Sequence, residues 1–291
     1  MDAREAVQPR RPPVPPYFDD LIAAYHRGAT ARSVHLGYWL DGDDGDFAAA
    51  QARLDQLMID LAEIRDGQSV LDAGCGFGGT LARINETHQD MGLAGVNIDA
   101  RQIDICRRVE SRAGNLLTWH IADATRLPFA GAAFDRVFCV EAMFHFASRR
   151  QFFAEAARVL TPGGVLAGTD ILISPAAQSA PFPIEAILQA GFGPWPDVWG
   201  EDADHVRLAA GPAFLDRASG AVESLIGDVR DITAEVAPSY RYTSPPDADP
   251  GDARAPAPMR ASAALRWLHD RGWLRYVAFR FERPHAAGAT R

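Results

Sequence analysis

An aspartate stands two residues before a cluster of glycines in the segment VLDAGCGFGG, where Asp72 follows an apolar run. This pattern predicts a buried strand that ends in a tight turn. Gly74, Gly76 and Gly79 match the GxGxxG spacing of dinucleotide-binding turns. A phosphate would gain nothing from a carboxylate at this place. We therefore expect Asp72 to hold a cationic group of a ligand through a charge-assisted hydrogen bond.

S-adenosylmethionine is a ligand with the required chemistry, because it carries a sulfonium and an α-ammonium and no phosphate. The sequence predicts that Asp72 binds the ammonium, directly or through water. Gly74, Gly76 and Gly78 would let the backbone approach the amino-acid and ribose portions closely.

A second group of chemically active residues lies in the segments CVEAMFHF and GTDIL. A histidine titrates near neutral pH, so His145 is a candidate general base that would take a proton from an acceptor hydroxyl. Asp170 could orient its imidazole or share the role of base, and the sequence leaves open which of the two is the base.

Alternating strand and helix patterns would supply the scaffold for these residues. Such alternation predicts an α/β fold with a doubly wound, mostly parallel sheet, whose ligands bind at the carboxyl ends of the strands. The expected strands are 69–74, 93–98, 116–123, 134–142, 165–173 and 274–284, and the expected helices are 17–30, 47–65, 80–88, 100–112, 149–160 and 259–271.

Changes in composition divide the chain into five parts. Residues 174–212, after the fifth strand, are rich in Pro, Gly and aromatic residues and predict an inserted cap. The full division is a disordered arm (1–16), an N-terminal helical lid (17–66), a cofactor-binding core (67–173), the cap insertion (174–212) and the C-terminal part of the core sheet (213–291).

Composition excludes several classes of function for these 291 residues. The net charge of -9 and the absence of a basic stripe argue against nucleic acid as substrate. The three cysteines are widely spaced, which indicates reduced thiols in a cytoplasmic protein and no zinc site. We expect no catalytic metal, no membrane span and no secretory signal.

Three motifs in order resemble the class I S-adenosylmethionine-dependent methyltransferases: VLDAGCGFGG, IADATRLPFAGAAFD and RVLTPGGVLAGTDI. The resemblance implies a Rossmann-like sheet of seven strands, with the last strand inserted antiparallel. It also implies that Asp123 contacts the adenine amino group and that the backbone of Ala124 faces the ring edge. Asn97 stands where many relatives have an acidic ribose-binding residue, and Gln102 would complete a neutral pair with it. Glu141 would line the methionine end of the cofactor through its backbone.

The segments RSVHLGYW, EAMFH and GTDIL look like those of natural-product methyltransferases, a group that includes sugar O-methyltransferases and sterol- and tocopherol-methylating enzymes. This similarity implies that VHLGYW packs over the cofactor, with Tyr38 at the cofactor and His35 reaching the acceptor. Aromatic residues would line a pocket for a bulky, partly apolar acceptor. These acceptor-pocket candidates are Phe144, Trp195 and Trp199.

The first functional hypothesis is O-methylation of a hydroxyl on a small secondary metabolite, such as a polyketide or a glycoside. The alternatives are C-methylation of an isoprenoid or enol carbon, N-methylation, a non-catalytic cofactor-binding subunit and an NAD(P)-dependent oxidoreductase. The sequence leaves open the identity of the acceptor and the oligomeric state, including a homodimer.

Overall fold

A central sheet of seven strands organises the protein, in the order β3-β2-β1-β4-β5-β7-β6. The computed structural model describes residues 14–28, 32–43, 45–195 and 225–285. β1 to β5 pair in parallel, whereas β7 is antiparallel to both β5 and β6. The strands are β1 (Ser69–Ala73), β2 (Gly92–Asn97), β3 (Leu116–Ile121), β4 (Phe134–Val140), β5 (Leu160–Ile173), β6 (Ile226–Asp231) and β7 (Leu274–Glu282). The predicted fold class and the antiparallel last strand are confirmed.

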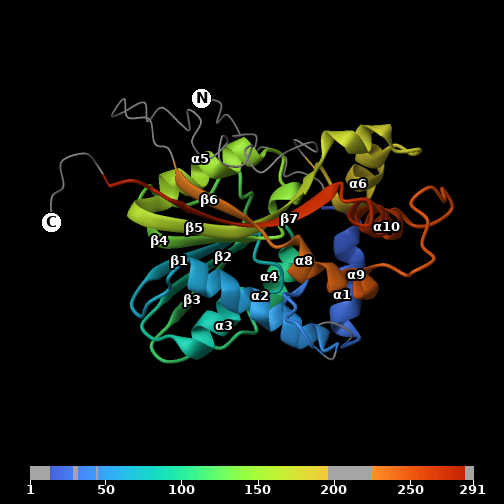
Figure 1. Ribbon diagram of the computed structural model, residues 1–291. Helices are drawn as coiled ribbons and strands as arrows, with labels where there is room; N and C mark the ends of the chain where they lie inside the picture. The colour runs from blue at the N-terminus through green and yellow to red at the C-terminus, as the bar shows by residue number, and fades with distance from the viewer. Residues whose placement is uncertain (1–13, 29–31, 44, 196–224, 286–291) are drawn as a thin grey trace, which may run out of the picture.

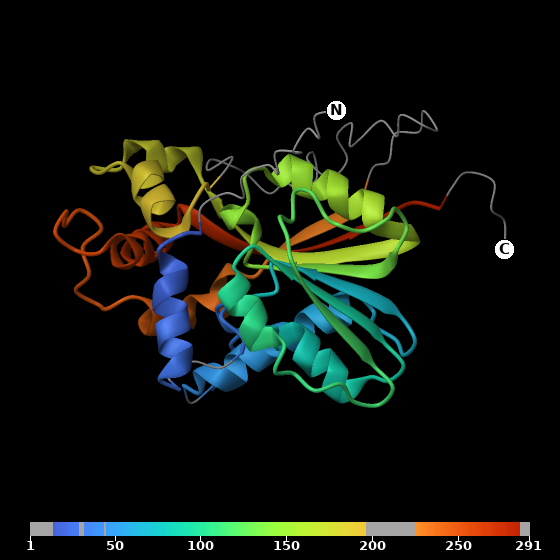
Figure 2. The same cartoon turned by 180° about the vertical axis from the view of Figure 1, so that it is seen from behind.

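Helices cover both faces of the sheet and gather at one of its ends (Figure 1). α5 lies on one face and α2, α3 and α4 lie on the other, as the reverse view also shows (Figure 2). The longer helices are α1 (Tyr17–His26), α2 (Phe47–Leu61), α3 (Gly79–Thr87), α4 (Ala100–Cys106), α5 (Arg149–Val159), α6 (Ile184–Phe192) and α10 (Ala257–His269). The short ones are η1 (Met143–His145), η2 (Pro175–Ser179), α8 (Thr233–Val236), η3 (Ala237–Ser239) and α9 (Tyr240–Thr243).

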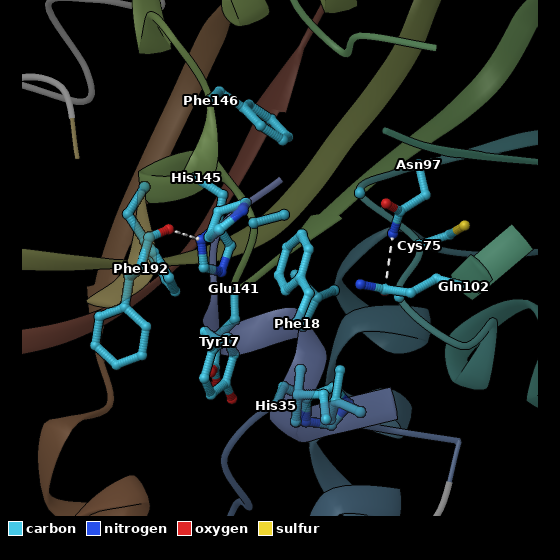
Figure 3. Close-up of a pocket in the computed structure, with 18 of the residues that line it drawn as sticks. Tyr17, Phe18, His35, Cys75, Asn97, Gln102, Glu141, His145, Phe146 and Phe192 are labelled. Atoms are coloured by element: carbon cyan, nitrogen blue, oxygen red, sulfur yellow. Dashed lines mark hydrogen bonds between the residues drawn. The ribbon is translucent and has the colours of Figure 1, made fainter. Parts of the chain in front are cut away.

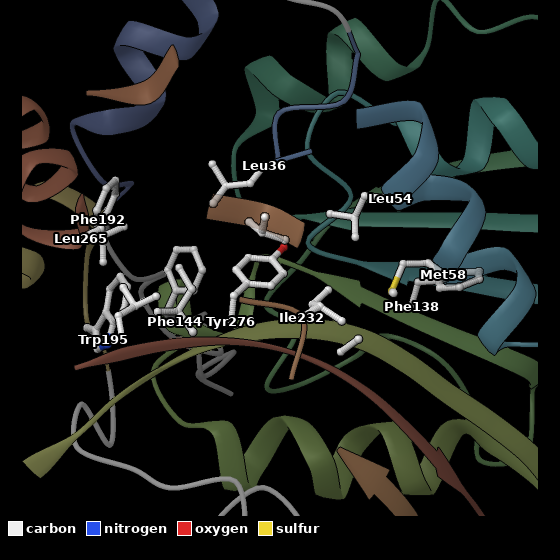
Figure 4. Close-up of a cluster of buried hydrophobic side chains, with 14 of the residues drawn as sticks. Leu36, Leu54, Met58, Phe138, Phe144, Phe192, Trp195, Ile232, Leu265 and Tyr276 are labelled. Atoms are coloured by element: carbon white, nitrogen blue, oxygen red, sulfur yellow. The ribbon is translucent and has the colours of Figure 1, made fainter. Parts of the chain in front are cut away.

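The core has two layers because successive strand residues point to opposite faces of the sheet. Val70 packs in the layer with α2, and its neighbour Leu71 packs in the layer with α5. Figure 4 shows part of the first layer, where Leu54 and Met58 of α2 lie near Phe138 of β4. Burial of these apolar faces fixes the positions of the strand ends.

Two elements differ most from their predicted bounds. α4 ends at Cys106 and not at residue 112, because the following residues are mostly exposed and Asn85 binds the carbonyl of Glu110 and the amide of Arg112. The expected TPGG turn is instead an irregular start of β5. There Gly163, with a φ of 78°, donates its amide to the carbonyl of Arg283.

Local capping explains where several of the helices begin. Asp46, Asp99 and Ser148 each accept a backbone N–H at the start of α2, α4 and α5. None of the helices in the described ranges has the length and apolar character that crossing a bilayer requires.

Candidate functional site

A cavity opens at the carboxyl edge of the sheet. The turns after β1 to β4 line it, together with α1, Phe192 and Tyr240. Figure 3 shows Asn97 and Gln102 at one side, His145 and Phe192 at the other, and Phe18 between them.

The glycine turn after β1 brings the backbone to the cavity. Gly74 has a φ of +85°, and a Cβ at this position would lie 2.4 Å from the Cβ of Ala142. Only glycine fits there without a shift of the neighbouring chain. Gly76 also lines the cavity, whereas Gly78 shapes the turn and packs against Trp119.

Asp72 lines the cavity and is only 3% exposed. No hydrogen bond from a described residue reaches its carboxylate. Burial, with a smaller contribution from the charge of Asp55, raises the pKa of Asp72 to about 7, although His35 opposes this rise. A buried carboxylate without a donor favours a cationic partner, because a positive charge restores the interaction that water supplied.

Asn97 and Gln102 form a buried pair on the adjoining wall. Asn97 Nδ2 donates to Gln102 Oε1 over 3.1 Å, and Gln102 Nε2 has no hydrogen-bond partner among the described residues. Asp123 and Ala124 also line the cavity. One oxygen of Asp123 accepts from the amide and the hydroxyl of Thr125. The wall therefore carries an amide donor and a carboxylate that suit ribose hydroxyls and an amino group.

Glu141 follows β4 with a φ of 47°, which is strained for a residue with a side chain. Its buried carboxylate accepts from Leu36 N over 2.6 Å and from Tyr276 OH over 2.5 Å. Burial raises the pKa of Glu141. The sequence predicted only a backbone role for this residue, whereas its side chain fastens the VHLGYW segment to the end of the sheet.

His35 lines the cavity as a buried cation. Its Nδ1 lies 2.7 Å from the carbonyl of Leu36 and its Nε2 lies 3.2 Å from Asp55 Oδ1. Both partners only accept, so both ring nitrogens donate. Burial alone would lower the pKa of His35, but Asp55 outweighs it and raises the pKa to about 9. Tyr38, in contrast, does not line the cavity, and its hydroxyl lies 3.5 Å from Glu235 of α8.

His145 lies in η1 at the other side of the cavity. Its Nδ1 donates to the carbonyl of Phe192 over 2.5 Å, because that oxygen can only accept. The lone pair of the neutral ring is therefore on Nε2. Burial lowers the pKa of His145 to about 4. The rings of Tyr17 and Phe18 pack on the imidazole with centroids 6.2 and 5.1 Å away.

Asp170 is fully buried and does not line the cavity. Its carboxylate binds Arg149 Nε over 2.6 Å and Nη2 over 3.2 Å. Side chains alternate along β5, so Ile171 lines the cavity while Asp170 points to the face that carries α5. This ion pair anchors the start of α5, just after His145. The sequence predicted that Asp170 shares the site with His145. The structure instead gives Asp170 a supporting role outside the cavity.

The acceptor side of the cavity is aromatic. Phe144 lines it, and Trp195 stacks behind Phe144 at 4.6 Å (Figure 4). Trp195 is buried and supports the wall of the expected pocket from behind Phe144. Trp199 lies outside the described residues.

Sequence reasoning missed several residues of this wall. They come from α1, from the loop after η1 and from α9: Tyr17, Phe18, Leu21, Phe146 and Tyr240. The aromatic residues at the start of α1 carried a helical pattern, but nothing local said which element they would face.

Among the described residues, no group of three or more His, Cys, Asp or Glu side chains could hold a metal ion.

Comparison with known proteins identifies the family that part of this chain matches. Residues 71–168, which run from β1 into β5, match the family described as a methyltransferase domain. Residues 71–168 are a methyltransferase domain. The resemblance that the three motifs indicated is confirmed for this stretch, and the methyltransferase domain contributes Asp72, Asn97, Asp123 and His145 to the cavity.

Relatives of the methyltransferase domain include enzymes of natural-product biosynthesis. Methyltransferase GfsG of Streptomyces halstedii is 36% identical over 48% of this chain and 51% of its own length. Erythromycin 3''-O-methyltransferase of Saccharopolyspora erythraea is 35% identical over 53% of this chain and 51% of its own length. The chain spans about half the length of these curated relatives.

Solved structures extend the similarity to nearly the whole chain. Geranyl diphosphate C-methyltransferase from Streptomyces coelicolor A3(2), in complex with Mg²⁺, geranyl diphosphate and S-adenosyl-L-homocysteine, aligns with a TM-score of 0.66. The alignment covers 93% of this chain and 100% of that chain at 18% identity. At this identity the likeness establishes the fold alone.

Proposed function

We propose that this protein is an S-adenosylmethionine-dependent methyltransferase that O-methylates a hydroxyl of a small, largely apolar secondary metabolite. The observation that carries the proposal is the buried, donor-free carboxylate of Asp72 at the glycine turn of a methyltransferase domain. The O-methyltransferase among the relatives supports the choice of acceptor atom.

The residues around the turn fit the cofactor. Asp72 would hold the α-ammonium, the Asn97–Gln102 pair would take the ribose hydroxyls, and Asp123 would take the adenine amino group. Gln102 Nε2 is buried without a partner among the described residues, and a buried unsatisfied donor costs about 1–3 kcal/mol. A ribose oxygen would recover this free energy.

S-adenosylmethionine, when bound, supplies an electrophilic methyl group on its sulfonium. His145 would then take the proton of the acceptor hydroxyl on Nε2, because Nδ1 is already bound to Phe192. The rings of Tyr17, Phe18 and Phe144 would exclude water and position the acceptor, and such positioning supplies much of the rate of a displacement.

A C-methyltransferase is the second candidate, and the aromatic wall favours it. Ring faces stabilise a cation within about 6 Å. Here the rings of Tyr17, Phe18 and Phe144 surround His145, which would remove the proton from carbon. NMR of the product made with ¹³C-methyl-labelled cofactor separates O–CH₃ from C–CH₃.

Ligand-dependent stability tests the cofactor assignment. We expect S-adenosylhomocysteine at 100 times its Kd to stabilise the protein by about 2.7 kcal/mol, and NADH not to stabilise it. Thermal unfolding with each ligand measures the difference. Stabilisation by NADH alone would contradict both the proposal and the role of Asp72.

Tyr240 provides a test of the acceptor pocket. It is 4% exposed, and its hydroxyl has no hydrogen-bond partner among the described residues. Tyr240→Phe removes a buried unsatisfied group, so we expect the ligand-free protein to gain about 1 kcal/mol of stability. We propose that this hydroxyl hydrogen-bonds to the acceptor, and we therefore expect the KM of the acceptor to rise in Tyr240→Phe. A gain in stability with an unchanged KM would show that Tyr240 does not contact the acceptor.

Other sequence-based expectations stay predictions. They are a small-molecule partner without nucleic acid, a location in the cytoplasm, a lid formed by residues 17–66 and a cap formed by residues 174–212. Whether the protein is a homodimer stays open. α1 contributes Tyr17 and Phe18 to the cavity and α6 contributes Phe192, which supports the lid and the cap.

A further inference from the structure

Asp55 of α2 joins two chain segments that border the cofactor part of the cavity. It is 3% exposed and does not itself line the cavity. Its Oδ2 accepts from Ser33 Oγ over 2.7 Å, and its Oδ1 accepts from Thr80 Oγ1 over 2.8 Å and from His35 Nε2 over 3.2 Å. Ser33 and His35 follow α1, whereas Thr80 lies in the first turn of α3, directly after the glycine turn.

The two segments both bond to Asp55 and also lie in close contact with each other. A Cβ on Gly79 would lie 2.4 Å from Ser33 Oγ and 2.9 Å from Ser33 N. Ser33, His35, Gly79 and Thr80 all line the cavity. One carboxylate behind the wall therefore holds both sides of the wall together.

The charges of Asp55, His35 and Asp72 also influence one another across these segments. Asp55 of α2 and Glu141 at the end of β4 both favour the cationic form of His35. Asp72 of β1 responds to the negative charge of Asp55 and to the positive charge of His35. The ion pair behind the wall thus influences the carboxylate that faces the cavity.

We propose that Asp55 is a positioning residue for the cofactor, which clamps residues 33–36 onto the glycine turn. The inference rests on the proposed function, because it assumes that the cofactor occupies the cavity between these segments. Without Asp55, the side chains of Ser33, His35 and Thr80 lose their shared acceptor, and this link between the two segments is lost.

Calorimetric titration with S-adenosylhomocysteine tests the clamp without an acceptor. We expect Asp55→Asn to weaken binding about 10–100-fold, the loss that a charge-assisted hydrogen-bond network carries. The control is Asp135→Asn, whose carboxylate accepts from Ser69 N over 2.9 Å at the opposite end of β1. This control should lower the melting temperature and leave the affinity unchanged. If Asp55→Asn does not fold, the double variant Ser33→Ala/Thr80→Val removes two of the donors and keeps the ion pair, and it should weaken binding in the same direction.

The pH dependence of the affinity tests the influence of the charge of His35 on Asp72. Affinity should fall as the pH drops and Asp72 takes up a proton. His35→Gln removes a positive charge and leaves Asp55, so the acid limb of the affinity should move to higher pH. Asp55→Asn removes the charges of both partners, so the limb should stay close to that of the wild type.

The outcomes distinguish the two proposals. If the wild type does not bind S-adenosylhomocysteine, the proposed function fails. If the wild type binds it and the folded Asp55→Asn variant, or the folded Ser33→Ala/Thr80→Val variant, binds equally tightly, Asp55 is only structural and the clamp is wrong.

Discussion

Asp72→Asn is expected to weaken the binding of S-adenosylhomocysteine by about 10–100-fold near pH 8, because the α-ammonium loses its charged partner. The same substitution should stabilise the ligand-free protein. Burial raises the pKa of Asp72 from 3.8 to about 7, so the folded state binds more protons than the unfolded state between these values. The stability of the wild type therefore falls as the pH rises from about 4 to about 7, and Asp72→Asn escapes this loss.

The stability gap between Asp72→Asn and the wild type should be close to zero near pH 4 and about 4 kcal/mol near pH 8, since each pKa unit corresponds to about 1.4 kcal/mol. Urea unfolding at the two pH values measures the gap, and calorimetry measures the affinity. Asp135→Asn serves again as the control, with unchanged affinity. An Asp72→Asn protein that binds within twofold of the wild type would rule out the ammonium contact.

His145→Ala is expected to lower kcat by about 10²–10⁴-fold with an alcohol acceptor, the usual contribution of a general base. Cofactor affinity should stay unchanged, because His145 lies at the side of the cavity opposite Asn97 and Gln102 (Figure 3). Burial lowers the pKa of His145 to about 4, so its lone pair is available above that pH. The kcat of the wild type should therefore be flat from neutral pH downward and fall only near pH 4.

Two further substitutions sharpen the test of His145. His120→Ala is the matched control, because His120 lies on β3 outside the cavity and packs on Phe129. It should leave kcat unchanged. Asp170→Asn should lower the melting temperature, since Asp170 binds Arg149, and it should change kcat only slightly. A His145→Ala enzyme with kcat within about twofold of the wild type would remove His145 from the mechanism and favour an acidic acceptor such as a phenol or enol.

The sequence determined the order of the elements and the edge of the sheet at which the candidate site residues lie. Alternating periods predicted the βα units, and in a parallel sheet the strand ends meet at one edge. Asp72, Asn97, Asp123 and His145 all lie at or just beyond the ends of strands, so their convergence on one cavity was predictable. Gly74 was predictable too, because a local left-handed turn requires glycine.

Tertiary structure decided the partners of these residues and their protonation. The alternation along β5 put Asp170 on one face and Ile171 on the other, but only the packing of α5 and α6 fixed which face borders the cavity. The charge of His35 depends on Asp55, which lies 20 residues away in the sequence. Tyr17 and Phe18 reach the cavity because α1 packs across the strand ends. Contacts of this kind join segments that are distant in the chain, and local periodicity and turn chemistry carry no information about them.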